Sequence, residues 1–273
     1  MIAERTRVSS SWLELREPAD ARARSRELVE RLRPRFPAIG GLVIHDLASG
    51  TGSMGRWLAP LLPGPQRWVL HDLDEDLLGF AAVEAPPATA DGDSVVIETR
   101  RSDVTELQPE DLAGATLITA SALIDLLTHE ELARLVDSCV EAGCPALLSL
   151  SVVGEVALVP ADPFDSLVAA AFDAHQRRLT GRGRLLGPNA ASAAAEAFRD
   201  RRAKVLVRPS AWRLGAPEAA LTATWFTGWI RAACEQSPDL AAAAGSYTSR
   251  RLAEARAGEL AVTVGHTDLL VLP

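Results

Sequence analysis

The sequence is poor in lysine, tyrosine and cysteine. Lys204 is the only lysine and Tyr247 the only tyrosine among 273 residues. A nicotinamide-dependent hydride site of the Ser/Tyr-x-x-x-Lys type therefore cannot be assembled from a local motif. Cys139, Cys144 and Cys234 are an odd number of cysteines and lack the pair spacing of metal ligands. We interpret them as reduced, mostly buried thiols, as in a cytoplasmic protein.

The sequence also lacks several other motifs, and each absence excludes a class of site or location. The five histidines form no His-x-x-x-His pair, so we predict no metal site. No Gly-x-Ser-x-Gly elbow is present, which leaves a hydrolase triad without support. No apolar stretch approaches about 20 residues, so no membrane span is expected. The first eleven residues have no apolar core, and we predict no signal peptide and a cytoplasmic location.

Charge and composition fit a globular protein that does not bind nucleic acid. Hydrophobic residues make up 48% and charged residues 23% of the chain, which is neither a disordered nor a fibrous composition. The net charge of −8 would repel a phosphate backbone. We therefore expect a small molecule as the partner.

The most informative segment runs from Leu42 to Arg56. An apolar run, 42–44, is typical of a buried parallel strand and leads into Asp46, a glycine turn and a helix. Gly50 and Gly52 allow positive φ and leave no Cβ next to a ligand. The turn formally matches G-x-G-x-x-G, but in that motif the glycines hold a pyrophosphate, which an acid just before them would repel.

The wider pattern is acid-x-small-x-Gly-x-Gly, formed by Asp46, Ala48, Gly50 and Gly52. With this pattern the chain resembles the class I, Rossmann-like S-adenosylmethionine (SAM)-dependent methyltransferases. The resemblance implies SAM as the cofactor. The acid would organise the loop around the methionine part, and Ser49 and the glycines would contact the cofactor. Ala48 replaces the commoner first glycine.

The next ninety residues extend the resemblance. A second strand, 68–72, ends on Asp72, about twenty residues after the turn, where a ribose-binding acid is expected. By resemblance Asp72 binds both ribose hydroxyls and Leu73 lies against the adenine. Asp103 would bind the adenine amino group, with Val104 beside it, although Asp103 also suits a solvated loop. The fourth strand, 115–121, ends on Ser121, which would face the transferred methyl group.

The order of predicted strands and helices between 40 and 151 implies an α/β fold. We expect a doubly wound, mostly parallel seven-stranded sheet with helices on both faces and an antiparallel last strand. The family's strand order would be 3-2-1-4-5-7-6. We predict a single domain, 1–273, with an N-terminal helical cover (1–39), a cofactor-binding core (40–151), a helical insertion or lid after the fifth strand (152–202) and a C-terminal part (203–273).

The ends of the chain and the insertion are expected to hold the acceptor. The charged segment 12–33 predicts a helix that either covers the cofactor mouth or packs on the sheet. In the insertion, His175 and Gln176 lie beside an apolar helix face and could orient a substrate, while a lone histidine can also be structural. Trp212, predicted on a loop, is a candidate pocket wall.

Candidate general bases follow the fourth strand. Asp125 could accept a proton or cap a turn. His129 could accept a proton or lie in the first turn of the next helix. A base is optional, because methyl transfer depends largely on holding the nucleophile in line with the methyl group. The Asn-Pro-Pro-Tyr type motif is absent, which argues against methylation of nucleic-acid bases.

The sequence thus predicts SAM-dependent methyl transfer to a small-molecule O-, N- or C-nucleophile. Two alternatives stay open. One is an NAD-dependent oxidoreductase, supported by the formal glycine match and the acid at Asp72. The other is a non-catalytic protein that binds SAM on a methyltransferase scaffold.

Overall fold

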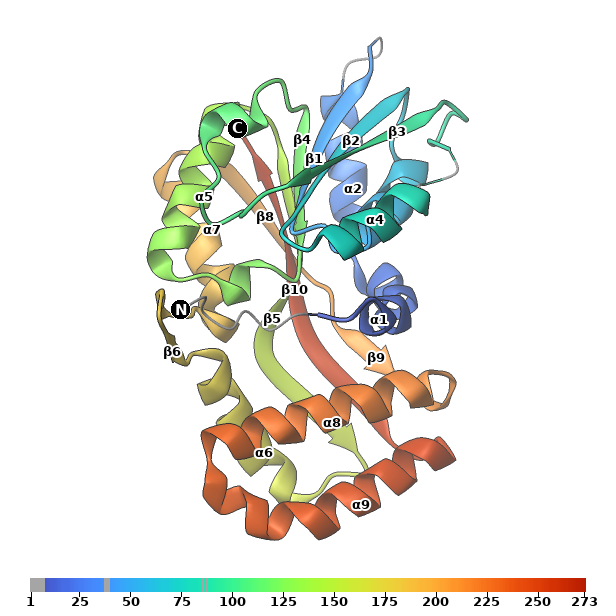
Figure 1. Ribbon diagram of the computed structural model, residues 1–273, viewed down its shortest axis with the longest axis vertical. Coiled ribbons are helices and arrows are strands. Elements are labelled where there is room, and N and C mark those ends of the chain that lie inside the picture. Colours follow the sequence, from blue (N-terminus) through green and yellow to red (C-terminus); the bar gives the residue numbers. More distant parts are fainter. Residues whose placement is uncertain (1–7, 37–39, 85, 87) are drawn as a thin grey trace.

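The computed structural model describes residues 8–36, 40–84, 86 and 88–273. Its centre is a mixed sheet with the order β3-β2-β1-β4-β5-β10-β8, and a short strand, β9, pairs with the outer part of β10 (Figure 1). The strands are β1 (Leu42–Leu47), β2 (Gln66–Asp72), β3 (Val95–Arg101), β4 (Leu117–Ser121), β5 (Ala146–Val159), β8 (Lys204–Pro209), β9 (Trp212–Leu214) and β10 (Ala261–Leu272). Strands β1 to β5 are parallel, and β10 is antiparallel to its neighbours β5, β8 and β9. The predicted fold class and strand order are confirmed, with β9 as an addition.

Helices cover both faces of this sheet. They are α1 (Ser10–Ala23), α2 (Arg26–Leu32), α3 (Ser53–Leu58), α4 (Glu75–Val83), α5 (His129–Ala142), α6 (Pro163–Gln176), α7 (Ala190–Asp200), α8 (Ala219–Gln236) and α9 (Ala241–Ala257). A two-stranded hairpin, β6 (Leu179–Thr180) and β7 (Gly183–Arg184), follows α6.

The side chains of each strand point alternately to the two faces of the sheet, and this divides the core into two layers. In β10, Leu269 and Val271 pack with α5 and α7, whereas Leu270 and Leu272 pack with α2, α3 and α4. Successive side chains of a strand point to opposite faces, so a continuous apolar run supplies both layers. The sheet is therefore buried on both sides, and ligands can reach it only at its ends or edges.

A third apolar cluster lies beyond the end of the parallel sheet. The strands β5 and β10 continue past their neighbours as a long antiparallel ribbon, against which α6, α8 and α9 pack (Figure 1). Phe226 and Trp229 of α8 are fully buried there. This extension gives the carboxyl edge of the sheet a second wall.

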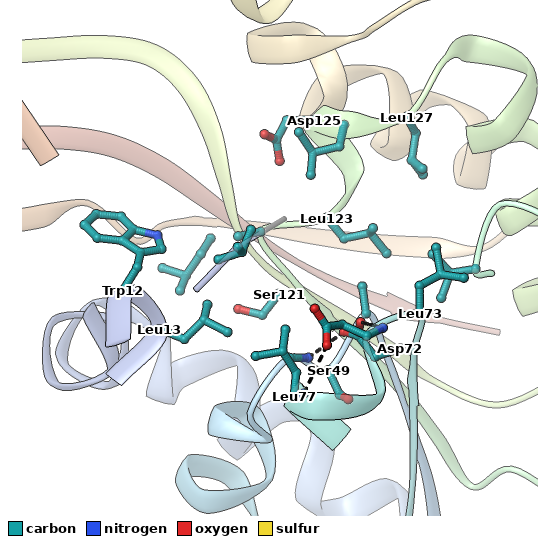
Figure 2. Close-up of a pocket in the computed structure, with 18 of the residues that line it drawn as sticks. Trp12, Leu13, Ser49, Asp72, Leu73, Leu77, Ser121, Leu123, Asp125 and Leu127 are labelled. Carbon is teal, nitrogen blue, oxygen red and sulfur yellow. Dashed lines mark hydrogen bonds between the residues drawn. The ribbon is translucent and has the colours of Figure 1, made fainter. Parts of the chain in front are cut away.

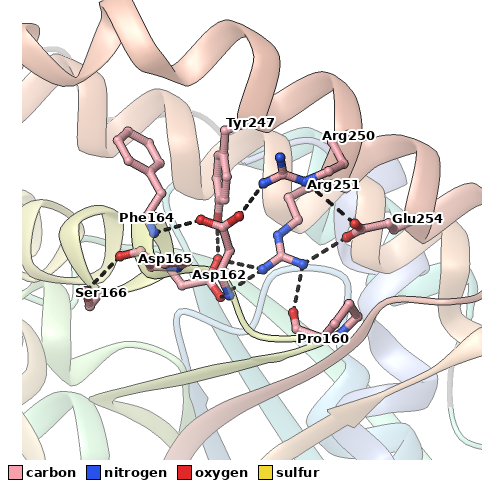
Figure 3. Close-up of polar contacts among 10 residues, drawn as sticks. Pro160, Asp162, Phe164, Asp165, Ser166, Tyr247, Arg250, Arg251 and Glu254 are labelled. Carbon is pink, nitrogen blue, oxygen red and sulfur yellow. Dashed lines mark hydrogen bonds and ion pairs between the residues drawn. The ribbon is translucent and has the colours of Figure 1, made fainter.

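Buried charges attach α9 to α6 in this extension (Figure 3). Arg251, 1% exposed, donates to both oxygens of Asp165 at 2.9 Å and to Glu254 at 2.8 Å. The Tyr247 hydroxyl donates to the same Asp165 carboxylate at 2.5 Å. Arg250, which is more exposed, pairs with Asp162 at the N-terminus of α6.

Several local expectations differ from the structure. The helix expected over 12–33 is two helices, because the chain turns at Arg24 and Ser25 caps α2. The fifth strand was expected to end at Ser151 but continues to Val159. Trp212 lies in β9 and not on a loop, because its backbone pairs with Val264. Long strands of this kind depend on a distant partner strand, which local sequence does not show.

Candidate functional site

A cavity of about 930 Å³ opens at the carboxyl ends of the parallel strands. Its wall includes the turn after β1, the ends of β2 and β4, the loop after β3, and parts of α1, α6, α8 and β10. In an open α/β sheet ligands bind at this edge, where the strand order reverses between β1 and β4. Figure 2 shows Trp12 and Leu13 on one side of the cavity, Asp72 and Leu73 on the other, and Ser121 between them.

The turn after β1 is held by the neighbouring strand. Gly50 has φ +55°, and its N–H donates to Asp72 Oδ2 at 2.8 Å. Ala48, also at positive φ (+52°), and Ser49 line the cavity with Gly50. A Cβ at Gly50 would lie 3.0 Å from Leu13 Cδ1 of α1, so glycine permits the close approach of α1 here.

Asp46 lies behind this turn with 1% of its surface exposed. Its Oδ1 accepts a hydrogen bond from Thr119 Oγ1 at 2.7 Å, and its Oδ2 has no hydrogen-bond partner among the described residues. Burial raises the pKa of this carboxyl to about 7, although Thr119 and the nearby Arg24 oppose the shift. A buried carboxyl with an unsatisfied oxygen at a cavity wall suits a cationic or hydrogen-bond-donating ligand group.

Asp72 lies at the end of β2 and organises two loops at once. Its Oδ2 accepts from Gly50, and its Oδ1 accepts from the backbone N–H of Asp74 at 2.9 Å. Asp74 in turn caps α4 by accepting from the backbone N–H groups of Asp76 and Leu77. Leu73, which lines the cavity, keeps 39% of its surface exposed.

Asp103, Val104 and Ser121 complete this end of the cavity. Asp103 Oδ1 accepts from the N–H and the hydroxyl of Thr105, at 3.0 and 2.7 Å, which fixes the loop after β3. The Ser121 hydroxyl accepts a hydrogen bond from Arg24 at 3.1 Å. These residues meet Asp72 and the glycine turn in one cavity, and their roles toward a cofactor stay a prediction.

Arg24 was not identified from the sequence. It is 3% exposed, donates to the Ser53 and Ser121 hydroxyls, and lies over the Trp57 ring at 5.5 Å. Burial lowers its pKa, while the nearby Asp20 carboxylate raises it. In the arginine-rich segment around it, nothing in the sequence distinguishes Arg24 from its exposed neighbours.

Asp268 was also not identified from the sequence. It holds the backbone of Leu150, a residue of the cavity wall. It is 1% exposed, and its two oxygens accept from the backbone N–H groups of Ser25 and Leu150, both at 2.8 Å. Leu150 lies in the cavity wall at φ +57°. Asp268 occupies a register shift in β10, which turns its side chain toward β5 and α2.

The other end of the cavity is apolar and aromatic. Trp12, Phe172, Trp212 and Trp225 reach it from α1, α6, β9 and α8. The Arg16 guanidinium lies 5.0 Å from the Trp212 ring centroid and makes two hydrogen bonds to Asp20. Asp20 also accepts from the Trp212 indole N–H at 2.9 Å.

Two further titratable groups line the aromatic end. Burial raises the pKa of Asp125 to about 6, and Arg16 opposes this shift. Asp125 Oδ1 has no hydrogen-bond partner in the part of the chain that the structure describes. Burial lowers the pKa of His266 to about 4, so this ring is neutral near pH 7.

Four predicted site residues lie elsewhere. His129 is exposed in the first turn of α5, and neither it nor His175 or Gln176 lines the cavity. His175 and Gln176 are on α6, but it is Phe172, one turn earlier, that faces the cavity. A Cβ at Gly52 would meet Ala81 of α4 at 3.2 Å, so a larger side chain there would enter α4 and not the cavity. Helical periodicity locates an apolar face but does not tell which residues of that face meet a ligand.

The described residues contain neither a membrane-spanning helix nor a cluster of metal ligands. None of their helices is long and apolar enough to cross a bilayer. No group of three or more His, Cys, Asp or Glu side chains among them could hold a metal ion.

The strand order and the cavity at the carboxyl edge define the fold of class I SAM-dependent methyltransferases. No protein-family model matches the chain, and no curated protein matches it in sequence. The likeness is structural. The cyclopropane synthase MmaA2 from Mycobacterium tuberculosis is 11% identical with a TM-score of 0.50, over 97% of this chain and 94% of that one.

Two other solved structures are similar at lower TM-scores. A SAM-dependent methyltransferase from Geobacter sulfurreducens, in complex with S-adenosyl-L-homocysteine, is 14% identical over 97% of this chain and 98% of that one, with a TM-score of 0.45. Phosphoethanolamine N-methyltransferase 2 from Haemonchus contortus is 14% identical over 98% of this chain and 59% of that one, with a TM-score of 0.47.

Proposed function

We propose that this protein binds SAM and transfers its methyl group to a small-molecule acceptor. One observation carries the proposal. A single cavity joins the turn between Asp46 and Gly50, the acid at the end of β2, and a second, aromatic compartment beyond the end of β4. Its volume, about 930 Å³, is near the upper end of the range of small-molecule sites. The cavity therefore has room for a cofactor and a second molecule.

The residues at the first end fit the chemistry of SAM. The unsatisfied Oδ2 of Asp46 suits the methionine ammonium. The Asp72 carboxylate, already fixed by two backbone N–H groups, can accept further bonds from ribose hydroxyls. Leu73 and Val104 offer apolar surface to the adenine, with Asp103 at its edge. When bound, SAM supplies an electrophilic methyl group, and the role of the chain is to hold that group and the acceptor together.

The arrangement gives less support to an NAD-dependent oxidoreductase. The buried acid at Asp46 would lie close to a pyrophosphate bound by the turn. Tyr247 donates to Asp165 in the cluster that joins α6 and α9 and does not line the cavity. Neither Tyr247 nor Lys204 is available to a hydride site there.

Titration calorimetry tests the proposal. We expect SAM and S-adenosylhomocysteine to bind, and NAD and NADP to show no comparable heat. Tight binding of NAD without a response to SAM would refute the proposal. If SAM binds but no acceptor is methylated in a broad screen with methyl-labelled SAM, the non-catalytic alternative would replace it.

A further inference from the structure

The aromatic end of the cavity forms a distinct compartment, which we call the acceptor compartment. We define it by Trp12, Arg16, Asp125, Phe172, Trp212 and Trp225. These residues come from α1, α6, β9, α8 and the segment after β4. Because elements far apart in the sequence converge here, the compartment is a product of the tertiary fold.

Aromatic side chains are concentrated in this compartment. The chain has six tryptophans, of which three line the cavity. Trp12, Phe172 and Trp225 are each only partly buried, so they present ring surface to the cavity. Partly exposed rings in a concave site bind planar apolar molecules by stacking and edge-to-face contacts.

The charged groups of the compartment favour an acceptor that becomes negative. Arg16 lies over the Trp12 and Trp212 rings, at 6.0 and 5.0 Å. Arg16 donates two hydrogen bonds to the Asp20 carboxylate, through Nε and Nη2. Arg178 and Arg182 of the β6–β7 region line the same cavity. Arg16 is paired with Asp20 and Arg182 with Glu131, so these guanidinium groups act here chiefly as hydrogen-bond donors, which suit a developing oxyanion.

Asp125 is a second carboxyl of the acceptor compartment, beside Asp20. It follows β4, whose carboxyl end borders the cofactor end of the cavity at Ser121 (Figure 2). One of its oxygens has no hydrogen-bond partner among the described residues, and the field of Arg16 acts on it. Burial raises its pKa to about 6, which is suitable for accepting a proton near neutral pH.

On the basis of the function proposed above, we propose that the acceptor is a planar aromatic compound with a hydroxyl group, whose proton Asp125 accepts. The hydroxyl oxygen forms the new O–CH₃ bond as the C–S bond of SAM breaks, and S-adenosylhomocysteine leaves with the electron pair of that bond. The proton passes from the hydroxyl to the Asp125 carboxylate. Arg16 stabilises the negative charge that develops on the oxygen.

Binding is tested first, without SAM. We expect 2-naphthol to quench the tryptophan fluorescence of the protein in a saturable manner. Phe172→Ala and Trp225→Ala should each weaken its affinity at least fivefold. Leu167→Ala, on the exposed outer side of the same helix as Phe172, is the matched control and should leave affinity unchanged. No saturable binding, or equal affinity in all three variants, would overturn the proposed acceptor class.

Turnover tests the role of Asp125. Asp125→Asn should lower kcat for 2-naphthol about 100-fold, because a positioned base contributes at least that much. The same variant should methylate 4-nitrophenol nearly as fast as the wild type at mildly alkaline pH, where this phenol is already ionised and needs no base. Asp137→Asn, an exposed acid of α5 paired with Arg201, serves as the control for folding and should leave both rates unchanged.

The outcomes separate this proposal from the function on which it rests. An equal loss with both phenols would show that Asp125 is not the base, and methylation of amines but not of naphthol would overturn the acceptor class. Either result would leave SAM binding in calorimetry intact. Absence of SAM binding, in contrast, would refute the proposed function itself and the methyl-transfer step with it.

Discussion

At the scale of a single residue, the burial of Asp46 is expected to influence how tightly a cationic cofactor binds. Its carboxyl is almost fully buried, and burial raises its pKa to about 7. A bound ammonium would favour the carboxylate form, so the pKa would fall in the complex. If Asp46 holds the cofactor ammonium as proposed, the affinity for the cofactor is linked to pH through this residue.

We expect the affinity for SAM to be nearly constant above pH 7 and to fall by up to tenfold per pH unit below it. The reason is that protonated Asp46 must lose its proton before it can pair with the ammonium. Calorimetry between pH 5.5 and 8 measures the dependence. Asp46→Asn should bind more weakly at pH 8 and show a flat profile. Asp125→Asn should keep the wild-type dependence, and a flat wild-type profile would contradict this role of Asp46.

Asp72 is predicted to hold the ribose. Asp72→Ala should weaken SAM binding at least tenfold, because charge-assisted hydrogen bonds contribute about 1.5–3 kcal/mol each. The variant also removes the acceptor of the Gly50 and Asp74 N–H groups. Asp72→Asn, which retains one acceptor oxygen, separates the two effects and should lose less affinity. Asp200→Asn, at the exposed end of α7, is the control, and unchanged affinity in Asp72→Ala would place the ribose elsewhere.

At the scale of elements, ion pairs join the N-terminal helix α1 to other helical segments. Arg56 makes a two-point ion pair with Glu17, which fixes α1 to α3 beside the glycine turn. Arg22 of α1 pairs with Glu218 just before α8. The helix that covers the cavity is thus tied to the cofactor end and to the helical extension at once.

The cluster that joins α6 to α9 gives a stability prediction. Arg251→Met should lower the free energy of unfolding by about 3 kcal/mol, because it leaves the largely buried Asp165 carboxylate with fewer partners. Urea denaturation measures the change. Arg250→Met removes an adjacent ion pair whose arginine is 52% exposed, and it should cost at most about 1 kcal/mol. Equal losses in the two variants would show that burial of the pair is unimportant.

Buried titratable groups with opposite shifts act on the stability of the whole molecule. Burial lowers the pKa values of His45, His71 and His266 to about 4. Their stabilising contribution is complete above pH 6.5, the ordinary pKa, and is lost as the pH falls toward 4. Burial raises the pKa values of Asp46 and Asp125 to about 7 and 6. Their contribution to stability is complete below pH 3.8, the ordinary pKa, and is lost as the pH rises through the raised pKa values.

The two groups of residues therefore oppose each other between pH 4 and 6.5. We expect wild-type stability to change less in this window than either group of residues alone would cause. His45→Gln with His71→Gln removes two protonations of the unfolded state, so its stability relative to the wild type should rise as pH falls, by about 1.4 kcal/mol per pH unit for each histidine. Asp46→Asn with Asp125→Asn should shift the slope in the opposite direction. Urea midpoints at pH 4.5 and 6.5 test both predictions. The same pH dependence of stability in the wild type and in both variants would show that these residues do not oppose each other.

Much of this molecule could be predicted from its sequence. The positions of the parallel strands could be predicted because buried strands show continuous apolar runs, such as 42–44 and 146–148, and their order in the sheet was predicted from the resemblance to the class I methyltransferases. Asp46, Gly50, Asp72, Asp103 and Ser121 meet in one cavity because each lies at or just after the carboxyl end of a parallel strand, and those ends lie at one edge of the sheet. A local pattern, the family resemblance and one topological rule were sufficient to predict that these residues lie together, and their roles toward a cofactor stay a prediction.

The acceptor end could not be predicted in the same way. His175 and Gln176 share a helix with Phe172, but the packing of α6 on α8 decides which side chains reach the cavity. Trp212 is placed there by the pairing of β9 with the extension of β10, and Arg24 is buried among residues distant in the sequence, including Ser53 and Ser121. The sequence by itself located the strands through apolar periodicity, and its resemblance to the class I methyltransferases predicted their order and the residues expected at the cofactor edge. Contacts between residues far apart in the chain, which have no local signature, decided the shape and charge of the acceptor compartment.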